Sequence, residues 1–278
     1  MPYWLEKINP NLLDENKYKK YGRWNKSKRE RFYDLASKTY LQYGDYEKCI
    51  EISAQALESR ENFVDDADVW YRWRIAKSLF NLNQLTESLE YAIEVTKSKP
   101  EWYVYNMIAK IYQRLNKPLL SLEYLCPAIL SNVPDKIKLN TYYTAYQTLK
   151  NLHKDQALKH AQYFSLLKFD YRSSVPNDIR KLNIDVSQLN KKQLQKEIKE
   201  VWLQYQYRGQ KPQQGKIIKF FDDKKFGFIR NVTGEEIFFH QSEFFGDSLV
   251  VGQNVSFFTK NTYDKVKKQN SLKAVYIK

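Results

Sequence analysis

The sequence predicts a multidomain α + β chain, in which a solenoid of paired helices precedes a smaller β-sheet domain. Three observations predict this arrangement. A chain of 278 residues has room for about two domains. Between residues 30 and 171, apolar side chains recur at helical spacing, and breaks in this pattern follow one another after 39, 33 and 36 residues. Near the C-terminus, two short segments alternate in the manner of β-strands.

Residues 1–29 form a basic and aromatic segment ahead of the first predicted helix. Lysines and arginines alternate with tyrosines here, and Trp4 and Trp24 flank the stretch. Basic side chains interleaved with aromatic rings are suited to contact with RNA. The favoured interpretation is instead a cap that packs Trp4 and Trp24 on the first helix.

Residues 30–171 carry the repeating helical pattern, with breaks at Gly44, Asn83, Asn116 and Leu152. A small side chain stands seven residues before and five residues after each break, where the two helices of a hairpin would cross closely. These residues are Ser37, Ala76, Ala109 and Ala145, then Cys49, Ser88, Ser121 and Ala157. By this register the segment resembles four tetratricopeptide repeats, at about 30–63, 69–102, 102–135 and 138–171, although the family's tryptophan is missing. The resemblance implies a groove that binds a protein partner.

Residues 172–206 are predicted to form a loop and then a helix that caps the repeats. The loop contains Ser173, Pro176 and Asn177, which favour turns. Asn190 and Gln193 have the spacing of a helix-starting capping box. Apolar residues then recur at helical spacing as far as Tyr205, and Trp202 among them is expected in the core. Residues 207–214 are predicted to be a short linker, and residues 215–278 the β domain.

Two segments of the β domain predict an aromatic surface. Side chains alternate between the faces of a strand, so Phe226, Phe228 and Arg230 share one face, and Phe238 and His240 share one face of the next strand. A turn at Thr233-Gly234 would pair the two strands. The outward rings would then form an aromatic platform, defined as Phe226, Phe228, Phe238 and His240. Such platforms stack on the bases of single strands while nearby cations contact phosphates.

These residues resemble the two RNP-type motifs of the cold-shock domain. The first motif is Lys224-Lys225-Phe226-Gly227-Phe228-Ile229, and the second is Ile237-Phe238-Phe239-His240-Gln241-Ser242. Gly215 and Gly252 match glycines that the family has in its first and fourth strands. The resemblance covers about a quarter of the chain and implies a five-stranded OB-fold β-barrel that binds single-stranded RNA or DNA.

The sequence departs from this family in two places. Lys225 stands where the family has glycine, and the first strand lacks the family's tryptophan. Two alignments of that strand are open, which place either Lys219 or Phe220 at the tryptophan position. The residues expected to bind nucleic acid are therefore Lys219, Phe220, Lys224, Phe226, Phe228, Arg230, Phe238 and His240.

The positive charge avoids the predicted repeats. The chain has a net charge of +14, yet residues 32–171 carry 17 basic and 17 acidic side chains. Residues 1–31 and 172–214 each carry +5, and residues 215–278 carry +4. A basic domain with basic flanks suits an anionic polymer. A lysine-rich solvated surface is the alternative, and the aromatic platform favours nucleic acid over it.

The sequence offers no motif for catalysis, a cofactor, a metal or a small-molecule substrate. His153 and His160 have no cysteine or glutamate that would complete a metal site, and no phosphate-binding loop or nucleophile elbow is present. Cys49 and Cys126 are expected to be structural. No apolar run is long enough for a membrane helix, and no signal peptide opens the chain, so a reducing cytoplasm is expected.

The sequence therefore predicts a non-enzymatic adaptor, in which the barrel binds single-stranded nucleic acid, with RNA favoured, and the repeats bind a protein. Two alternatives remain open at this point. The chain could be an accessory subunit of a nuclease or of a bacterial defence system, with catalysis on another chain. It could also be a tetratricopeptide scaffold whose barrel docks only on protein.

Overall fold

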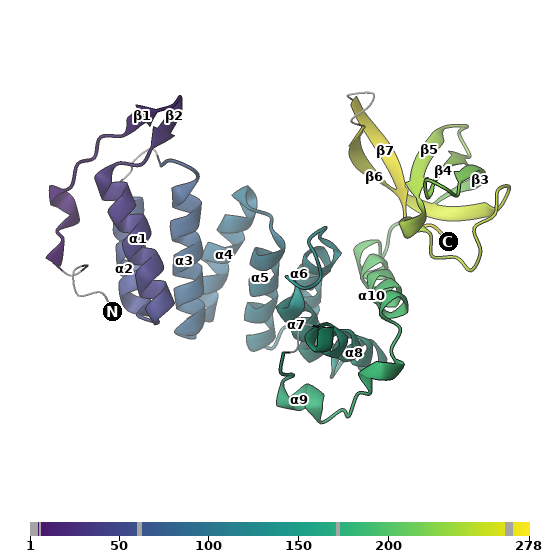
Figure 1. Cartoon of the computed structure of the whole chain (residues 1–278), viewed down its shortest axis with the longest axis horizontal. Coiled ribbons are helices and arrows are strands. Elements are labelled where there is room, and N and C mark those ends of the chain that lie inside the picture. Colours follow the sequence, from purple (N-terminus) through teal and green to yellow (C-terminus); the bar gives the residue numbers. More distant parts are fainter. Residues whose placement is uncertain (1–4, 6, 60–62, 171–172, 265–268) are drawn as a thin grey trace. The chain divides into compact units, whose positions relative to one another are not determined.

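The computed structural model describes residues 5, 7–59, 63–170, 173–264 and 269–278 (Figure 1). Its contacts divide the chain into two compact units, residues 1–157 and residues 158–278. Helices make up most of the first unit, and a closed β-barrel ends the second. The predicted α + β order, with a helical region before a five-stranded barrel, is confirmed.

The first unit begins with two short strands and continues in helical pairs. A 3-10 turn, η2 (Pro10–Leu12), precedes the antiparallel strands β1 (Tyr18–Lys20) and β2 (Arg23–Asn25). The pairs are α1 (Lys28–Tyr43) with α2 (Tyr46–Glu58), α3 (Ala67–Asn81) with α4 (Leu85–Ser98), and α5 (Trp102–Arg114) with α6 (Pro118–Leu130). α7 (Leu139–Leu149) follows, and α8 (Lys154–Asp170) contains the boundary between the units. Each helix from α1 to α6 packs on the next one along the chain.

The helical pairs turn where the sequence breaks its pattern. Gly44 ends α1 in the left-handed region with φ of 79°, a conformation that glycine adopts without a steric penalty. Asn83 and Asn116 lie at the next two breaks with φ of 61° and 56°. Asparagine tolerates this region better than most residues because its short side chain bonds locally. The local turns therefore set the period of the solenoid.

The predicted small residues lie at the helix crossings. All eight are buried, and none is more than 3% exposed. Within the first pair, the Cys49 thiol donates to the Ser37 carbonyl oxygen at 3.2 Å. Within the second pair, the Ser88 hydroxyl donates to the Ala76 carbonyl oxygen at 2.8 Å. Each small side chain thus permits a close crossing, and two of them also bond the backbone of the facing helix.

The N-terminal segment covers the first helices with its apolar residues but not with Trp24. Leu5 is buried in the cluster formed with α1, α2 and α3, and Ile8 and Leu13 pack against it. Trp24 is 62% exposed because it lies on the β1–β2 hairpin, so its predicted packing on the first helix is wrong. Trp4 lies outside the described residues.

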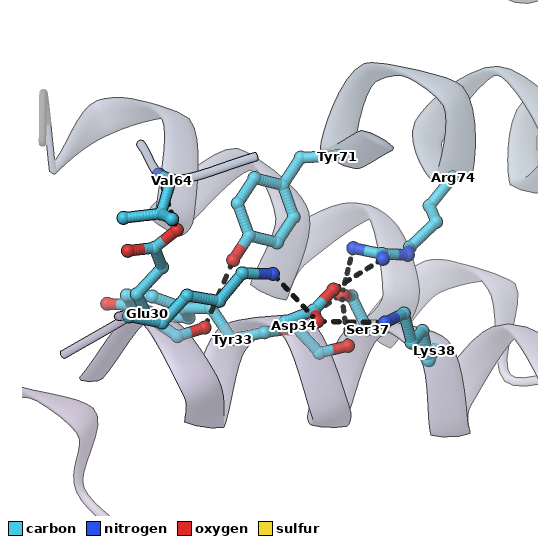
Figure 2. A network of polar contacts seen from close by, with 9 residues as sticks. Glu30, Tyr33, Asp34, Ser37, Lys38, Val64, Tyr71 and Arg74 are labelled. Carbon is cyan, nitrogen blue, oxygen red and sulfur yellow. Dashed lines mark hydrogen bonds and ion pairs between the residues drawn. The ribbon is translucent and has the colours of Figure 1, made fainter. Parts of the chain in front are cut away.

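A polar network joins α1 to α3 in the first unit (Figure 2). The Asp34 carboxylate forms ion pairs with Arg74 at 2.5 Å, Lys38 at 2.8 Å and Lys26 at 3.1 Å. Arg74 is only 5% exposed and also donates to the Ser37 hydroxyl at 3.1 Å. Burial alone would raise the pKa of the Asp34 carboxyl, but Lys38, Arg74 and Lys26 together lower it to about 2. The first helical pair is therefore tied to the second by a mostly desolvated charge cluster.

The second unit combines short helices with the barrel. Its helical part contains α9 (Asn177–Arg180), η3 (Val186–Gln188) and α10 (Lys191–Gln206). The strands are β3 (Gln213–Phe221), β4 (Phe226–Asn231), β5 (Glu236–His240), β6 (Asn254–Asp264) and β7 (Gln269–Val275), with η4 (Gln241–Glu243) after β5. They close in the order β3-β4-β5-β7-β6 around a core that contains Ile217, Ile229, Phe239 and Phe257.

Helix α10 belongs to the same compact unit as the barrel. The Asn190 side chain accepts from the Gln193 amide at 3.1 Å and so starts the helix as predicted. Trp202 is fully buried, and its indole N–H donates to His160 Nε2 on α8 at 2.8 Å. On the barrel side, Lys199 of α10 pairs with Glu243 at 3.1 Å. The sequence predicted this helix as a cap for the repeats and did not predict its contact with the barrel.

Residues 207–214, predicted as a linker, are not a free hinge. The Tyr207 ring stacks on Phe258 of β6 with 4.2 Å between centroids and 9° between planes. Strand β3 starts at Gln213, and Gln213 pairs with Phe257 of β6. Nearby, Lys278 at the chain end pairs with Glu200 of α10 at 2.7 Å. Stacking and ion pairing therefore fix the start of the barrel to α10.

We expect Asp34→Asn to destabilise the first unit by about 3 kcal/mol, because it leaves the buried Arg74 guanidinium without its counter-charge. Urea unfolding followed by helical circular dichroism measures this loss. The matched control is Asp68→Asn, which breaks an exposed pair with Arg72 on the same unit. An exposed pair contributes about 0.5 kcal/mol. Equal effects of the two variants would contradict the role of Asp34.

The same carboxylate makes the stability of the first unit depend on acid pH. Its pKa is about 2 in the folded chain, against 3.8 for a free aspartate. The folded state therefore gains stability above pH 3.8, and this gain is lost as the pH falls from about 4 to about 2. A shift of this size corresponds to roughly 2 kcal/mol. We expect this pH-dependent part of the free energy of unfolding to be absent in Asp34→Asn and present in Asp68→Asn, as measured by unfolding curves across this pH range.

Candidate nucleic-acid interface

The β4–β5 hairpin sorts its side chains between the barrel core and an outer aromatic face. Phe226 lies opposite His240 and Phe228 lies opposite Phe238, on the outer side. The residues between them face inward, so that Ile229, Ile237 and Phe239 are buried in the core. This is the arrangement that the alternating sequence predicts. Asn231 and Gly234 close the connecting turn, because the Gly234 amide donates to the Asn231 carbonyl at 3.0 Å.

The phenylalanines of the aromatic platform pack against one another, Phe228 edge to face with both others and Phe226 tilted against Phe238, and all three are half-buried. Ring centroids are 5.5 Å apart for Phe226 and Phe238, 6.0 Å for Phe226 and Phe228, and 6.1 Å for Phe228 and Phe238. Such mutual contacts restrict the rotamers of all three rings. A base that stacks here would meet rings already held in place, so binding would cost little side-chain entropy.

Phe221 extends the aromatic platform, and Phe220 does not belong to it. The β3–β4 register shifts between Ile217 and Lys219, which indicates a β-bulge. After the bulge, Lys219 and Phe221 face outward, and the Phe221 ring lies 4.9 Å from that of Phe226. Phe220 packs against the core cluster, with its ring 6.1 Å from that of Phe239. The prediction placed Phe220 on the binding face because the extra residue of a bulge has no sequence signature here.

Gly227 allows the aromatic platform to form. A Cβ at this position would lie 2.4 Å from the Lys219 carbonyl oxygen and 2.7 Å from the Phe239 ring. Both distances are shorter than real carbon contacts, so any larger residue would push β4 away from β3. The outward rings at Phe226 and Phe228 therefore depend on a position between them that has no side chain.

His240 is oriented by the turn that follows β5. Its Nδ1 accepts from the Ser242 amide at 3.2 Å and lies 2.9 Å from the Ser242 hydroxyl. Since Nδ1 accepts from a backbone N–H, the neutral ring carries its proton on Nε2. The side chain is exposed, so Nε2–H is available to donate to an acceptor on a base or sugar. The ring also lies opposite Phe226 and continues the aromatic face.

The predicted cations differ in how strongly the protein already neutralises them. Lys219 lies over the Phe221 ring at 5.0 Å, and Lys224 is exposed in the β3–β4 turn. Within the described residues, neither one forms an ion pair. Arg230 instead pairs with Glu236 across the hairpin at 2.6 Å. Lys219 and Lys224 can therefore contact a phosphate directly. Arg230 would first have to break its ion pair with Glu236.

Lys225 takes the conformation that the family's glycine would supply. Its φ is 56°, in the left-handed region, which costs a residue with a side chain about 1–2 kcal/mol. Its ammonium pairs with Asp222 at 2.8 Å, and its carbonyl accepts from the Gln241 amide at 2.8 Å. The loop therefore keeps its shape despite the departure from the family motif.

Glu243 neutralises two lysines beside the aromatic platform. Its carboxylate lies 3.1 Å from Lys199 of α10 and 3.1 Å from Lys273 of β7, and its side chain is 14% exposed. Burial alone would raise the pKa of this carboxyl, but Lys199 and Lys273 lower it below its usual value. Lys273 lies opposite Phe238 on the neighbouring strand. Sequence spacing gives no signal for this contact, because 44 residues separate Lys199 from Glu243.

The described residues contain no group of three or more His, Cys, Asp or Glu side chains that could hold a metal ion. His160 accepts from Trp202, and Cys49 and Cys126 are buried thiols that form no disulfide within the described residues. Burial raises the pKa of the Cys126 thiol to about 12, which disfavours the reactive thiolate. In the part of the chain that the structure describes, no helix has the length and hydropathy to cross a membrane.

Comparison with known proteins identifies both kinds of domain. Residues 213–275 match the family of the 'Cold-shock' DNA-binding domain. Residues 30–63, which hold most of α1 and all of α2, match the tetratricopeptide repeat family. No curated protein matches the chain. The resemblance to the cold-shock domain is confirmed. The resemblance to tetratricopeptide repeats is confirmed over the first of the four predicted repeats.

The bulge in β3 predicts opposite phenotypes for two adjacent phenylalanines. Phe221→Ala should weaken single-strand binding by about 1–3 kcal/mol, the usual effect of losing a stacked ring, and should leave the fold intact. Phe220→Ala should destabilise the barrel by roughly 2–4 kcal/mol, because it opens a cavity beside Phe239. Binding by fluorescence polarisation and unfolding by urea separate the two effects. The reverse assignment of phenotypes would show that the β3 register is wrong.

Proposed function

We propose that this chain is a non-enzymatic adaptor that binds single-stranded RNA on its barrel and a protein partner on its helical repeats. The observation that carries the first part is the aromatic platform, extended by Phe221 and placed beside Lys219 and Lys224. Rings with open faces stack on any base, and lysines neutralise the phosphates between bases. The family match over residues 213–275 supports the same ligand class.

The geometry favours a single strand over a duplex. The rings of Phe226, Phe228 and Phe238 lie on the surface of a barrel and reach only bases whose faces are open. Bases in a duplex are stacked on one another and present only their edges. His240 adds one donor, through Nε2–H, which supplies limited base preference. Stacking therefore supplies most of the proposed affinity, and the sequence specificity of the binding is weak.

A protein partner for the repeats is supported by their packing and charge. The repeats pair their helices like tetratricopeptide repeats, and residues 32–171 carry no net charge. A surface without net charge lacks the long-range attraction that drives nonspecific binding of nucleic acid. Half-buried rings such as Trp73 and Tyr103, 5.4 Å apart on α3 and α5, offer contact area for a peptide. The cytoplasm is the proposed compartment, because both described cysteines are buried thiols rather than members of a disulfide.

The aromatic platform should account for most of the affinity. Phe226→Ala, Phe228→Ala and Phe238→Ala should each weaken binding of a labelled single-stranded RNA by about 1–3 kcal/mol through the loss of a stacked base. The control is Val232→Ala, at an 82% exposed position in the adjacent turn, which should bind as the parent chain does. A matched single-stranded DNA measures the preference for RNA. Parent-like affinity in all three phenylalanine variants would rule out this binding face.

Salt dependence should separate the free lysines from the paired arginine. Each phosphate contact contributes about −0.7 to the slope of log K against log salt for a single strand. Lys219→Ala and Lys224→Ala should each flatten the slope by about that amount. Arg230→Ala should flatten it less, because Glu236 already neutralises Arg230. Conversely, Glu236→Gln should strengthen binding by releasing Arg230. An equal loss from all three cation variants would show that the Arg230–Glu236 pair does not matter.

A further inference from the structure

The β1–β2 hairpin is an exposed structure that the barrel's function does not explain. Lys19 lies opposite Trp24, and Lys20 lies opposite Arg23. Tyr21 and Gly22 form the two-residue turn, both in the left-handed region with φ of 51° and 77°. Such turns suit the right-handed twist of paired strands. At the base of the hairpin, the Arg31 guanidinium of α1 lies over the Tyr18 ring at 5.3 Å and bonds its hydroxyl.

Two aromatic rings on this hairpin face solvent rather than the core. Tyr21 is 93% exposed and Trp24 is 62% exposed. Within the described residues, neither ring packs against another aromatic side chain. Burial of a tryptophan would stabilise the fold, so an exposed one on an ordered strand leaves a favourable contact unused. The local pairing of β1 with β2 explains the shape of the hairpin but not the position of these rings.

The hairpin is positively charged and contains no acidic side chain. Residues 17–25 include Lys17, Lys19, Lys20 and Arg23, with no aspartate or glutamate among them. In the described part of the chain, these four cations form no ion pair. The nearest acidic residue in sequence, Glu15, is already paired with Arg29 at 2.5 Å. The charge of the hairpin is therefore open to an external anion.

Rings and charges come together on the same surface. Lys19 and Trp24 lie opposite each other and so share one face of the hairpin. Lys17, Arg23 and Trp24 also line a cleft of about 1130 Å³, whose other wall includes Phe63 and Val64. Asp65 and Glu15 are on the lining too, and Arg29 neutralises Glu15. The cleft thus brings the Trp24 indole together with two basic side chains, Lys17 and Arg23.

We propose that the β1–β2 hairpin is a second contact site for single-stranded nucleic acid, in which Trp24 and Tyr21 stack on bases and Lys17, Lys19, Lys20 and Arg23 contact phosphates. An acidic protein surface would use the four cations, but it would not need two ring faces open to solvent. A duplex would meet the cations but would hide its base faces. This inference rests on the proposed function only in that both sites take the same class of ligand.

The test uses the full chain with two single-stranded RNAs. A strand of about 8 nucleotides matches the site size of one OB-type barrel, and a strand of about 40 nucleotides has length to spare for a second site. Trp24→Ala should weaken binding of the long strand about tenfold, the effect of losing one stacked base. The matched control is Tyr43→Ala, which removes another 62% exposed aromatic ring from the same unit and should have no effect.

The charges are tested separately from the ring. The double variant Lys19→Ala with Lys20→Ala should flatten the salt slope for the long strand by about 1.4, two phosphate contacts at about 0.7 each. The variant Lys19→Arg with Lys20→Arg keeps both charges and should keep the slope. Ultraviolet crosslinking of the long strand, with 4-thiouridine as the reactive base, should yield crosslinked peptides from residues 17–25 as well as from the barrel.

The outcomes distinguish this inference from the function of the barrel. If Trp24→Ala and the lysine variants bind the long strand as Tyr43→Ala does, the hairpin site is overturned and an acidic protein becomes the better ligand. Stronger competition by a duplex than by the single strand overturns it as well. If Phe228→Ala leaves the short strand bound while Trp24→Ala still weakens the long strand, the barrel proposal fails and the hairpin site stands.

Discussion

The outward faces of both units depend on points at which two backbones lie so close that only glycine or a small side chain fits between them. In the barrel, a Cβ on Gly227 would overlap the Lys219 carbonyl and the Phe239 ring, and one on Gly215 would lie 2.6 Å from the Arg230 carbonyl. In the repeats, Ala76 and Ala109 are fully buried at helix crossings. Close packing of this kind fixes the registers of strands and helices. The registers then decide which side chains point to solvent.

Once the register is fixed, the barrel presents rings where most proteins would bury them. Gly227 and Ile229 fill the inner side of β4, so Phe226 and Phe228 have no place in the core. They contact each other and Phe238 instead, which hides part of their area and keeps their faces open. An exposed cluster of three rings costs solubility unless a ligand covers it. In the unbound protein, the contacts among the three rings reduce the apolar area that water meets, and so reduce this solubility cost.

Sequence patterns predicted the elements in which buried side chains recur at a regular spacing. The helical pairs, the Asn190 cap and the faces of β4 and β5 follow from apolar spacing and local hydrogen bonds, which leave a signature over a few residues. The β-bulge that exchanges Phe220 for Phe221 has no such signature, since it depends on how β3 meets β4 and β6 together. The contact of Lys199 with Glu243 joins residues 44 positions apart, so no local sequence pattern predicts it either. Trp24 differs from its prediction for another reason, because the pairing of β1 with β2 holds it on a hairpin instead of on the first helix.

Charge pairing within the chain limits how its positive charge can act. Arg230, Lys225, Lys199 and Lys273 all lie within 3.1 Å of a carboxylate, so the barrel shows an approaching strand less positive charge than its composition suggests. Lys219 and Lys224 remain beside the rings, and four further cations remain on the β1–β2 hairpin. The stacked rings of the aromatic platform add binding energy that salt screens less than it screens phosphate contacts. Affinity of this kind would persist at ionic strengths that remove purely electrostatic binders.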